Sequence, residues 1–254
     1  MTKVNVGTQI YDVELIICDK DGTLTNFNIM WGNWIKNWID LLVTKTGEKH
    51  NLDLTLLTEN LDKTLGFKRD VTSVVPESPV AVSTLSKISI AAMVVLYQSG
   101  IDWHSAEELI GYVASQPIIM TADMVQPVGD VKQAFEEWSA AGIKIIVATS
   151  DDREPTMEAV KLMGIEHLIN EYYCGDDPIP NKPNPEAIHR LSKAYNILPS
   201  QMLMVGDAVS DMAFGRNGKV AGCIGISGGS GDQVALEEAA DRVIKSVDEI
   251  KVES

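Results

Sequence analysis

Short apolar segments that alternate with helical patterns constrain the fold of this chain more than any other feature. From residue 127 onward, β-branched and apolar runs of strand length are separated by stretches whose apolar residues recur every three or four positions. Strands connected through helices pair in parallel by right-handed crossovers, and the helices cover both faces of the sheet. We therefore predict an α/β fold with a Rossmann-like, doubly wound parallel sheet. The expected strands are residues 13–18, 143–148, 171–174, 202–205, 220–226 and 242–244.

A long segment after the first expected strand has a different character. Its apolar residues recur at helical spacing, and no strand pattern alternates with them. We therefore predict an all-helical subdomain, residues 26–124, inserted into a core made of residues 1–25 and 125–254. The expected helices cover residues 31–42, 52–65, 83–99 and 105–114, and Ser105 with Glu108 forms a candidate capping box for the last of them.

The composition narrows the classes of partner. The 254 residues include 36 Asp and Glu against 21 Lys and Arg, which gives a formal charge of −15. Such an acidic chain is a poor general binder of nucleic acid or of anionic membranes. An anionic substrate is still compatible with it, because a bound metal and one well-placed lysine reverse the sign locally.

Targeting signals and cysteine usage favour a cytoplasmic protein. The first residues contain no basic region followed by an apolar core, and no apolar run is long enough to cross a bilayer. Cys18, Cys174 and Cys223 are widely spaced and odd in number, so we expect small buried side chains and no disulfide framework or zinc site.

Two carboxylates follow the first expected strand directly. Asp19 and Asp21 stand at its carboxyl end, and Gly22 permits a tight turn after them. One carboxylate could act as a nucleophile and the other as a proton carrier, with a divalent cation offsetting their repulsion. An acidic turn chosen only for its loop conformation explains these residues equally well.

Polar residues also end the other expected strands. Thr149 and Ser150 follow the second core strand, 175–177 follows the third, and Gly206 with Asp207 follows the fourth. Ligands of open parallel sheets bind beyond the carboxyl ends of the strands, so these residues are candidate site residues. Taken singly, Thr149 reads as a helix cap, and Asp207 as the start of a capped helix. The run SGGSGD at 227–232 is expected to be a flexible loop.

Four ordered motifs in this chain resemble those of the haloacid dehalogenase superfamily. They are Asp19-Lys20-Asp21-Gly22-Thr23-Leu24, Thr149 at the end of IIVAT, Lys182 in NKPNPEAI, and Asp207 with Asp211 in MVGDAVSDM. Alone, Lys182 would read as a solvated surface lysine and Asp211 as part of an exposed helix face. Their joint occurrence in this order favours the catalytic interpretation.

The resemblance implies a role for each matched position. Asp19 would be the nucleophile, and Asp21 would protonate the leaving group and then deprotonate the attacking water. Mg²⁺ would be held by the Asp19 carboxylate, the Asp21 backbone carbonyl and Asp207, with Asp211 beside them. The substrate's phosphoryl group would be bound by the motif residues Thr23, Thr149, Ser150 and Lys182, of which Thr149 and Lys182 would also act in catalysis.

The resemblance further implies a phosphatase. An aspartate at position 21 separates this chain from the dehalogenases of the superfamily, and the helical insertion stands where phosphoglycolate phosphatases and β-phosphoglucomutases carry a helical cap. The expected activity is hydrolysis of a small phosphorylated metabolite, phosphoglycolate-like or a sugar phosphate, through an aspartyl phosphate. A phosphomutase or phosphotransferase of the β-phosphoglucomutase type and a non-catalytic binding protein are the alternatives. Monomer and homodimer both remain open, and Lys20 departs from the apolar residue that many relatives carry there.

Overall fold

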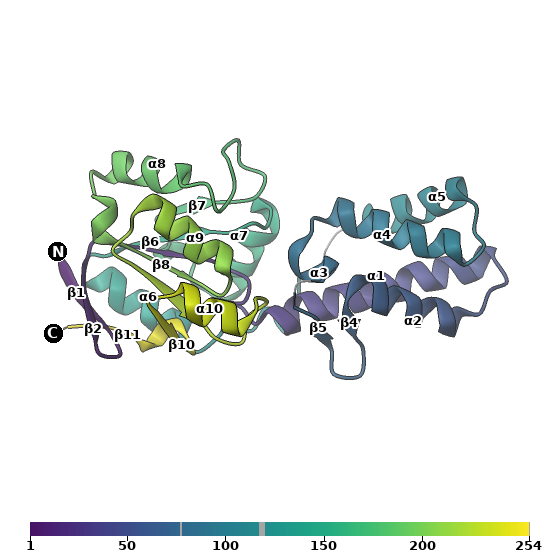
Figure 1. Ribbon diagram of the computed structural model, residues 1–254, viewed down its shortest axis with the longest axis horizontal. Coiled ribbons are helices and arrows are strands. Elements are labelled where there is room, and N and C mark those ends of the chain that lie inside the picture. The colour runs from purple at the N-terminus through teal and green to yellow at the C-terminus, as the bar shows by residue number, and fades with distance from the viewer. Residues whose placement is uncertain (77, 117–119, 254) are drawn as a thin grey trace. The chain divides into compact units, whose positions relative to one another are not determined.

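A computed structural model describes residues 1–76, 78–116 and 120–253. The chain divides into two compact units, which Figure 1 shows as ribbons. The first, here called the core unit, comprises Met1–Phe27 and Met120–Ser254. The second, here called the inserted unit, comprises Asn28–Ile119. The range 26–124 predicted for the inserted subdomain contains residues 77 and 117–119, which lie outside the described residues.

The core unit is built on a six-stranded sheet in the described part of the chain. Its strands are β3 (Leu15–Cys18), β6 (Lys144–Ala148), β7 (Glu171–Tyr173), β8 (Met202–Gly206), β9 (Gly222–Ile226) and β10 (Arg242–Ile244). They follow the order β10-β9-β8-β3-β6-β7, and every neighbouring pair is parallel. This confirms the predicted doubly wound parallel sheet.

Both faces of this sheet are buried, because successive side chains of a strand point to opposite faces. In β3, Ile16 and Cys18 belong to one apolar cluster, whereas Leu15 and Ile17 belong to the other. Helices α6 (Val131–Ala140) and α7 (Arg153–Leu162) pack on the first face, and α8 (Glu186–Tyr195), α9 (Val209–Gly218) and α10 (Gln233–Ala239) pack on the second. Short 3₁₀ turns lie at Glu166–Leu168, Pro199–Gln201 and Val247–Glu249.

A second, antiparallel sheet joins the two ends of the chain (Figure 1). It consists of β1 (Thr2–Val6), β2 (Gln9–Val13) and β11 (Ile250–Val252), with Val4 opposite Val252. The prediction of one strand over residues 13–18 was therefore wrong at its start. Val13 is the last residue of β2 and pairs with Thr2 of β1, and the apolar run continues past a bend at Glu14 into β3.

The inserted unit is mainly helical. Its elements are α1 (Phe27–Lys49), α2 (Leu54–Leu65), β4 (Phe67–Lys68), β5 (Ser73–Val74), α3 (Pro79–Val82), α4 (Leu85–Gln98) and α5 (Trp103–Ala114). The pair β4 and β5 was not predicted. It follows Gly66, which ends α2 with a φ of 80° and lets the chain turn back. Among the described residues, none of the helices combines the length and the apolar character that a membrane span requires.

The predicted capping box of the last inserted helix was wrong in position. The N-cap of α5 is Asp102, whose carboxylate accepts the Ser105 N–H at 3.0 Å. Ser105 therefore lies inside the first turn, because an aspartate three residues earlier already binds its amide.

Candidate active site

The candidate site residues gather at the carboxyl ends of the central strands. In the sheet, β6 and β7 lie on one side of β3, and the later strands β8, β9 and β10 lie on the other side of β3. Asp19 follows β3, Thr149 follows β6, and Asp207 follows β8 directly. The strand order thus reverses at β3, and ligands of doubly wound sheets bind at such a point.

Lys182 links Asp19 to Asp211. Its Nζ lies 2.6 Å from Oδ1 of Asp19 and 2.6 Å from Oδ1 of Asp211, and all three side chains are at most 10% exposed. Burial by itself would lower the pKa of Lys182, but the two carboxylates outweigh it and raise that pKa above the usual lysine value. The ammonium group is therefore charged at neutral pH.

Asp207 is held by donors from two loops. Its Oδ2 accepts the N–H of Ser230 at 2.7 Å and the Oγ of Ser230 at 2.9 Å, and its Oδ1 accepts Thr23 Oγ1 at 3.3 Å. Burial, together with the nearby charge of Asp211, raises the pKa of Asp207 to about 6. Thr23, predicted to bind substrate, thus contacts a carboxylate of the site.

Three buried carboxylates form one cluster. Oxygen atoms of Asp19, Asp207 and Asp211 all lie within 4.8 Å of one another. Burial raises the pKa of Asp19 well above its usual value. The neighbouring carboxylates raise this pKa further, and the charge of Lys182 offsets only part of the increase. A hard divalent cation such as Mg²⁺ takes oxygen ligands of this kind and would relieve the excess negative charge, so the residues fit the predicted metal.

The close approach of the two acidic loops depends on Gly22. Its φ is 87°, in the left-handed region, and a Cβ at this position would overlap the carboxylate of Asp207. A side chain here would therefore push the loop after β3 away from the end of β8. Asp211 lies in the first turn of α9, and its Oδ2 accepts the Ala208 N–H at 3.1 Å.

The side chain of Asp21 points to a different partner. Oδ1 of Asp21 lies 2.8 Å from Nζ of Lys20, and the same Nζ lies 2.8 Å from Oδ2 of Asp151. The Asp21 carboxylate is thus outside the cluster of three acids. The use of the Asp21 backbone carbonyl as a metal ligand stays a prediction. Lys20 and Asp151 were not assigned a role from the sequence. The only local signal was an acid two residues after Thr149, the threonine that follows β6.

Thr149 and Ser150 occupy the loop after β6. The Thr149 N–H donates to Tyr173 O at 2.9 Å, and its Oγ1 accepts the Asp151 N–H at 3.1 Å. Among the described residues, the Thr149 hydroxyl donates to no acceptor, so its proton is available to a ligand. Ser150 is exposed, and a Cβ on Gly175 would overlap its carbonyl oxygen.

Ser230 is the further site residue that sequence reasoning missed. The loop at 227–232 was predicted to be flexible, whereas Ser230 makes two hydrogen bonds to Asp207. The detectable signal was a run of small residues directly after β9, at the same edge of the sheet as the acids.

Buried acids, a charged lysine and a hydroxyl thus meet at the switch point of a parallel sheet, and such groups suit an anionic ligand and a divalent cation. A family model described as haloacid dehalogenase-like hydrolase matches residues 13–219. The chain therefore belongs to the haloacid dehalogenase-like hydrolases, which confirms the resemblance seen in the motifs.

Several curated proteins are similar to part of the chain. It is 30% identical to a phosphoglycolate phosphatase of Vibrio vulnificus over 129 residues, which cover 48% of this chain and 55% of the relative. It is 25% identical to the pyrophosphatase PpaX of Halalkalibacterium halodurans over 127 residues, 50% of this chain and 59% of the relative. The chain thus spans little more than half the length of these relatives.

Solved structures share the fold over almost the whole chain. One is described as a predicted phosphoglycolate phosphatase from Haemophilus somnus 129PT, with a TM-score of 0.64, 18% identity, and coverage of 95% of this chain and 96% of that one. Another is a haloacid dehalogenase superfamily hydrolase of subfamily IA from Geobacter sulfurreducens PCA, with a TM-score of 0.57, 13% identity, and coverage of 93% and 94%.

Proposed function

We propose that this protein is a Mg²⁺-dependent phosphatase that hydrolyses a small phosphomonoester through an aspartyl phosphate on Asp19. The observation that carries the proposal is Asp19 itself, buried at the end of β3, 2.6 Å from Lys182 and clustered with Asp207 and Asp211. The names of the relatives, a phosphoglycolate phosphatase and a pyrophosphatase, support the same chemistry.

The reaction proceeds in two displacements at phosphorus. A carboxylate oxygen of Asp19 attacks the phosphorus, the bond to the leaving oxygen breaks, and Asp21 gives that oxygen a proton. A water molecule then attacks the phosphorus of the aspartyl phosphate and loses a proton to Asp21. The bond between phosphorus and Asp19 breaks, so inorganic phosphate leaves and both aspartates return to their starting states.

Cationic and hydroxyl groups hold the phosphoryl oxygens during both steps. Lys182 contributes a buried positive charge, and Thr149 a hydroxyl proton, with Ser150 beside it. Asp19, Asp207 and Asp211 and the backbone carbonyl of Asp21 would hold Mg²⁺, which would supply positive charge to offset the carboxylates and polarise the phosphoryl group. Thr23 orients Asp207 through its hydroxyl.

The inserted segment, residues 26–124, is proposed to act as a cap over the core of residues 1–25 and 125–254 and to select the substrate. The substrate class is a small phosphorylated metabolite, phosphoglycolate-like or a sugar phosphate, in the cytoplasm. The proposal rests on the helical content of the insertion and on its position between the motif of Asp19 and that of Thr149.

The test is turnover of a panel of phosphorylated metabolites, with Asp19→Asn as the central variant. Asp19→Asn is expected to lower kcat roughly 10³-fold or more, because the amide is a poor nucleophile. Asp12→Asn, at an exposed position of β2, is the matched control and is expected to retain activity. Mass spectrometry of rapidly quenched wild type should find phosphate on Asp19, and none on the Asp19→Asn variant.

Metal removal forms the second arm. Chelation should stop turnover, and Mg²⁺ should restore it, because the acidic cluster otherwise repels the phosphoryl oxygens. Near-normal activity of Asp19→Asn, or full activity in metal-free buffer, would contradict the proposal. Isomer formation from hexose phosphates without phosphate release would identify a mutase instead.

A further inference from the structure

Lys20, between the two aspartates of the first motif, is fully buried. A lysine is almost never removed from water completely unless its charge is paired, because desolvation of an ammonium group is costly. Here Nζ lies 2.8 Å from Oδ1 of Asp21 and 2.8 Å from Oδ2 of Asp151. Lys20 therefore joins the loop that follows β3 to the loop that follows β6.

Asp151 is a fixed anchor for this lysine. Its N–H donates to Thr149 Oγ1 at 3.1 Å, and its Oδ1 accepts the Asp152 N–H at 2.8 Å. Its carbonyl oxygen accepts the Gly175 N–H at 2.7 Å. The backbone and both carboxylate oxygens of Asp151 are thus engaged, so its position is set by the strand ends and not by Lys20 alone.

The other partner, Asp21, is held through one oxygen. Oδ1 accepts Nζ of Lys20 and, at 3.2 Å, the hydroxyl of Thr25. Neither donor binds Oδ2. A carboxyl group that passes a proton to a substrate works best with one oxygen fixed and the other presented to the reacting atom.

We propose that Lys20 is a positioning residue for proton transfer by Asp21. It ties Oδ1 of Asp21 to the Asp151 anchor, which fixes the rotation of the carboxyl group and presents Oδ2 to the leaving oxygen. This inference rests on the proposed phosphatase function. It differs from a purely structural role, in which Lys20 would only neutralise two partly buried acids.

The test compares two esters with different needs for a proton. The leaving group of 4-nitrophenyl phosphate departs as a stable anion, whereas the alkoxide of an alkyl phosphate such as phosphoglycolate requires protonation. Because kcat/KM reports the first irreversible step, it isolates transfer to Asp19 from later hydrolysis of the aspartyl phosphate. Lys20→Met is expected to lower kcat/KM by roughly 10²-fold for the alkyl ester and by less than about 10-fold for the nitrophenyl ester.

Further variants separate positioning from folding. Asp151→Asn removes the anchor without altering the first motif, and it should shift the ratio of the two kcat/KM values in the same direction. Asp21→Asn should shift the ratio of the two kcat/KM values the most, because it removes the proton donor itself. Adding Lys20→Met to Asp21→Asn should leave this ratio at the value of Asp21→Asn, because the group that Lys20 positions is already lost. Lys132→Met, at an exposed position on α6, is the matched control, and thermal unfolding monitors the fold of every variant.

The outcomes distinguish the two proposals. Equal losses on both esters in Lys20→Met and Asp151→Asn, or no loss in either, would overturn the positioning role while leaving the phosphatase intact. A ratio that Asp21→Asn does not shift would also overturn it. Wild type that hydrolyses neither ester would overturn the proposed function, and the positioning role with it.

Discussion

At the scale of single residues, the loop at 227–232 acts as a cradle for Asp207. Ser230 donates both its N–H and its hydroxyl to Oδ2 of Asp207. Gly229 makes this approach possible, because a Cβ at that position would overlap the Asp207 side chain. The small residues of the loop therefore orient one carboxylate of the candidate metal site, as outer partners of metal ligands commonly do.

Ser230→Ala is expected to weaken Mg²⁺ binding by about 10-fold, because it removes the hydroxyl donor to Asp207 and keeps the backbone donor. Calorimetric titration of metal-free protein measures the change without relying on activity. Ser227→Ala, in the same loop, is the control and should bind Mg²⁺ like the wild type. Equal affinities for Ser230→Ala and wild type would show that the hydroxyl does not orient Asp207.

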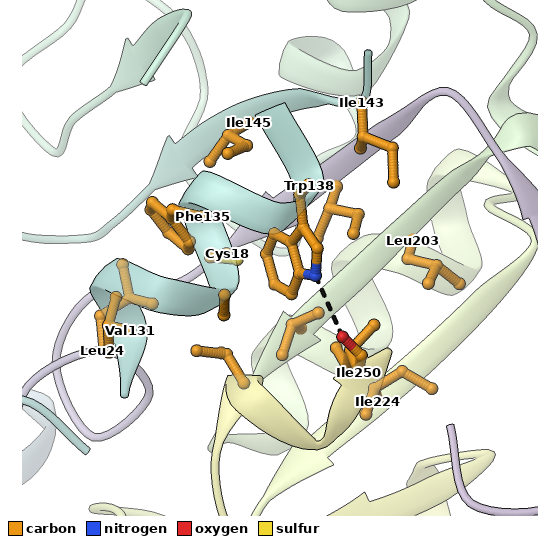
Figure 2. Close-up of a cluster of buried hydrophobic side chains, with 14 of the residues drawn as sticks. Cys18, Leu24, Val131, Phe135, Trp138, Ile143, Ile145, Leu203, Ile224 and Ile250 are labelled. Carbon is orange, nitrogen blue, oxygen red and sulfur yellow. Dashed lines mark hydrogen bonds between the residues drawn. The ribbon is translucent and has the colours of Figure 1, made fainter. Parts of the chain in front are cut away.

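At the scale of elements, α6 packs against both sheets of the core unit. Trp138 of α6 is fully buried in the apolar cluster shown in Figure 2, with its ring centroid 5.4 Å from that of Phe135. Its Nε1–H donates to the Ile250 carbonyl at 3.1 Å, which ties α6 to the start of β11. One side chain thus fills the space between elements and also satisfies a buried backbone group.

Trp138→Ala should lower the free energy of unfolding by about 3–5 kcal/mol, because it leaves a large cavity between α6 and the sheets. Trp138→Phe keeps much of the ring and loses the hydrogen bond, so a loss of about 1–3 kcal/mol is expected, which includes the cost of an unpaired carbonyl. Urea unfolding followed by circular dichroism measures both. A Trp138→Ala protein as stable as wild type would show that α6 is not held by this contact.

At the scale of the whole molecule, the two chain segments that flank the inserted unit are paired within the core unit. Asn26 N–H donates to Gln126 O at 2.8 Å, and Val128 N–H donates to Leu24 O at 3.0 Å. Thr25 also forms an isolated β-bridge with Pro127. The segment before the insertion is therefore hydrogen-bonded to the segment after it, and both segments belong to the core unit.

Replacement of residues 28–119 by a short Gly-Ser linker should leave a folded core unit, because shortening a loop between paired segments lowers the entropy cost of closing it. The shortened protein is expected to bind Mg²⁺ and to hydrolyse 4-nitrophenyl phosphate, but to lose discrimination among phosphorylated metabolites. Circular dichroism, thermal unfolding and the metabolite panel measure these properties. An unfolded product, or unchanged discrimination, would contradict the division of roles between the units.

The sequence by itself determined the class of fold and indicated most of the candidate site residues. Strand and helix patterns are local, and the doubly wound sheet follows from their alternation. Asp19, Thr149 and Asp207 could be placed at one edge because the carboxyl ends of parallel strands meet there. The ordered motifs added Lys182 and Asp211, and the structure brings both within 2.6 Å contact of each other.

Only the tertiary structure decided which distant segments meet. The pairing of Val4 with Val252 joins the two ends of the chain, and nothing local in either strand specifies its partner. The apolar run through Val13 into β3 reads as one strand, because the pattern does not reveal that it passes from one sheet to another. The links from Lys20 to Asp151 and from Ser230 to Asp207 join loops that follow different strands. These loops meet because β3 pairs with β6 and β8 pairs with β9, which the local sequence of the loops does not specify.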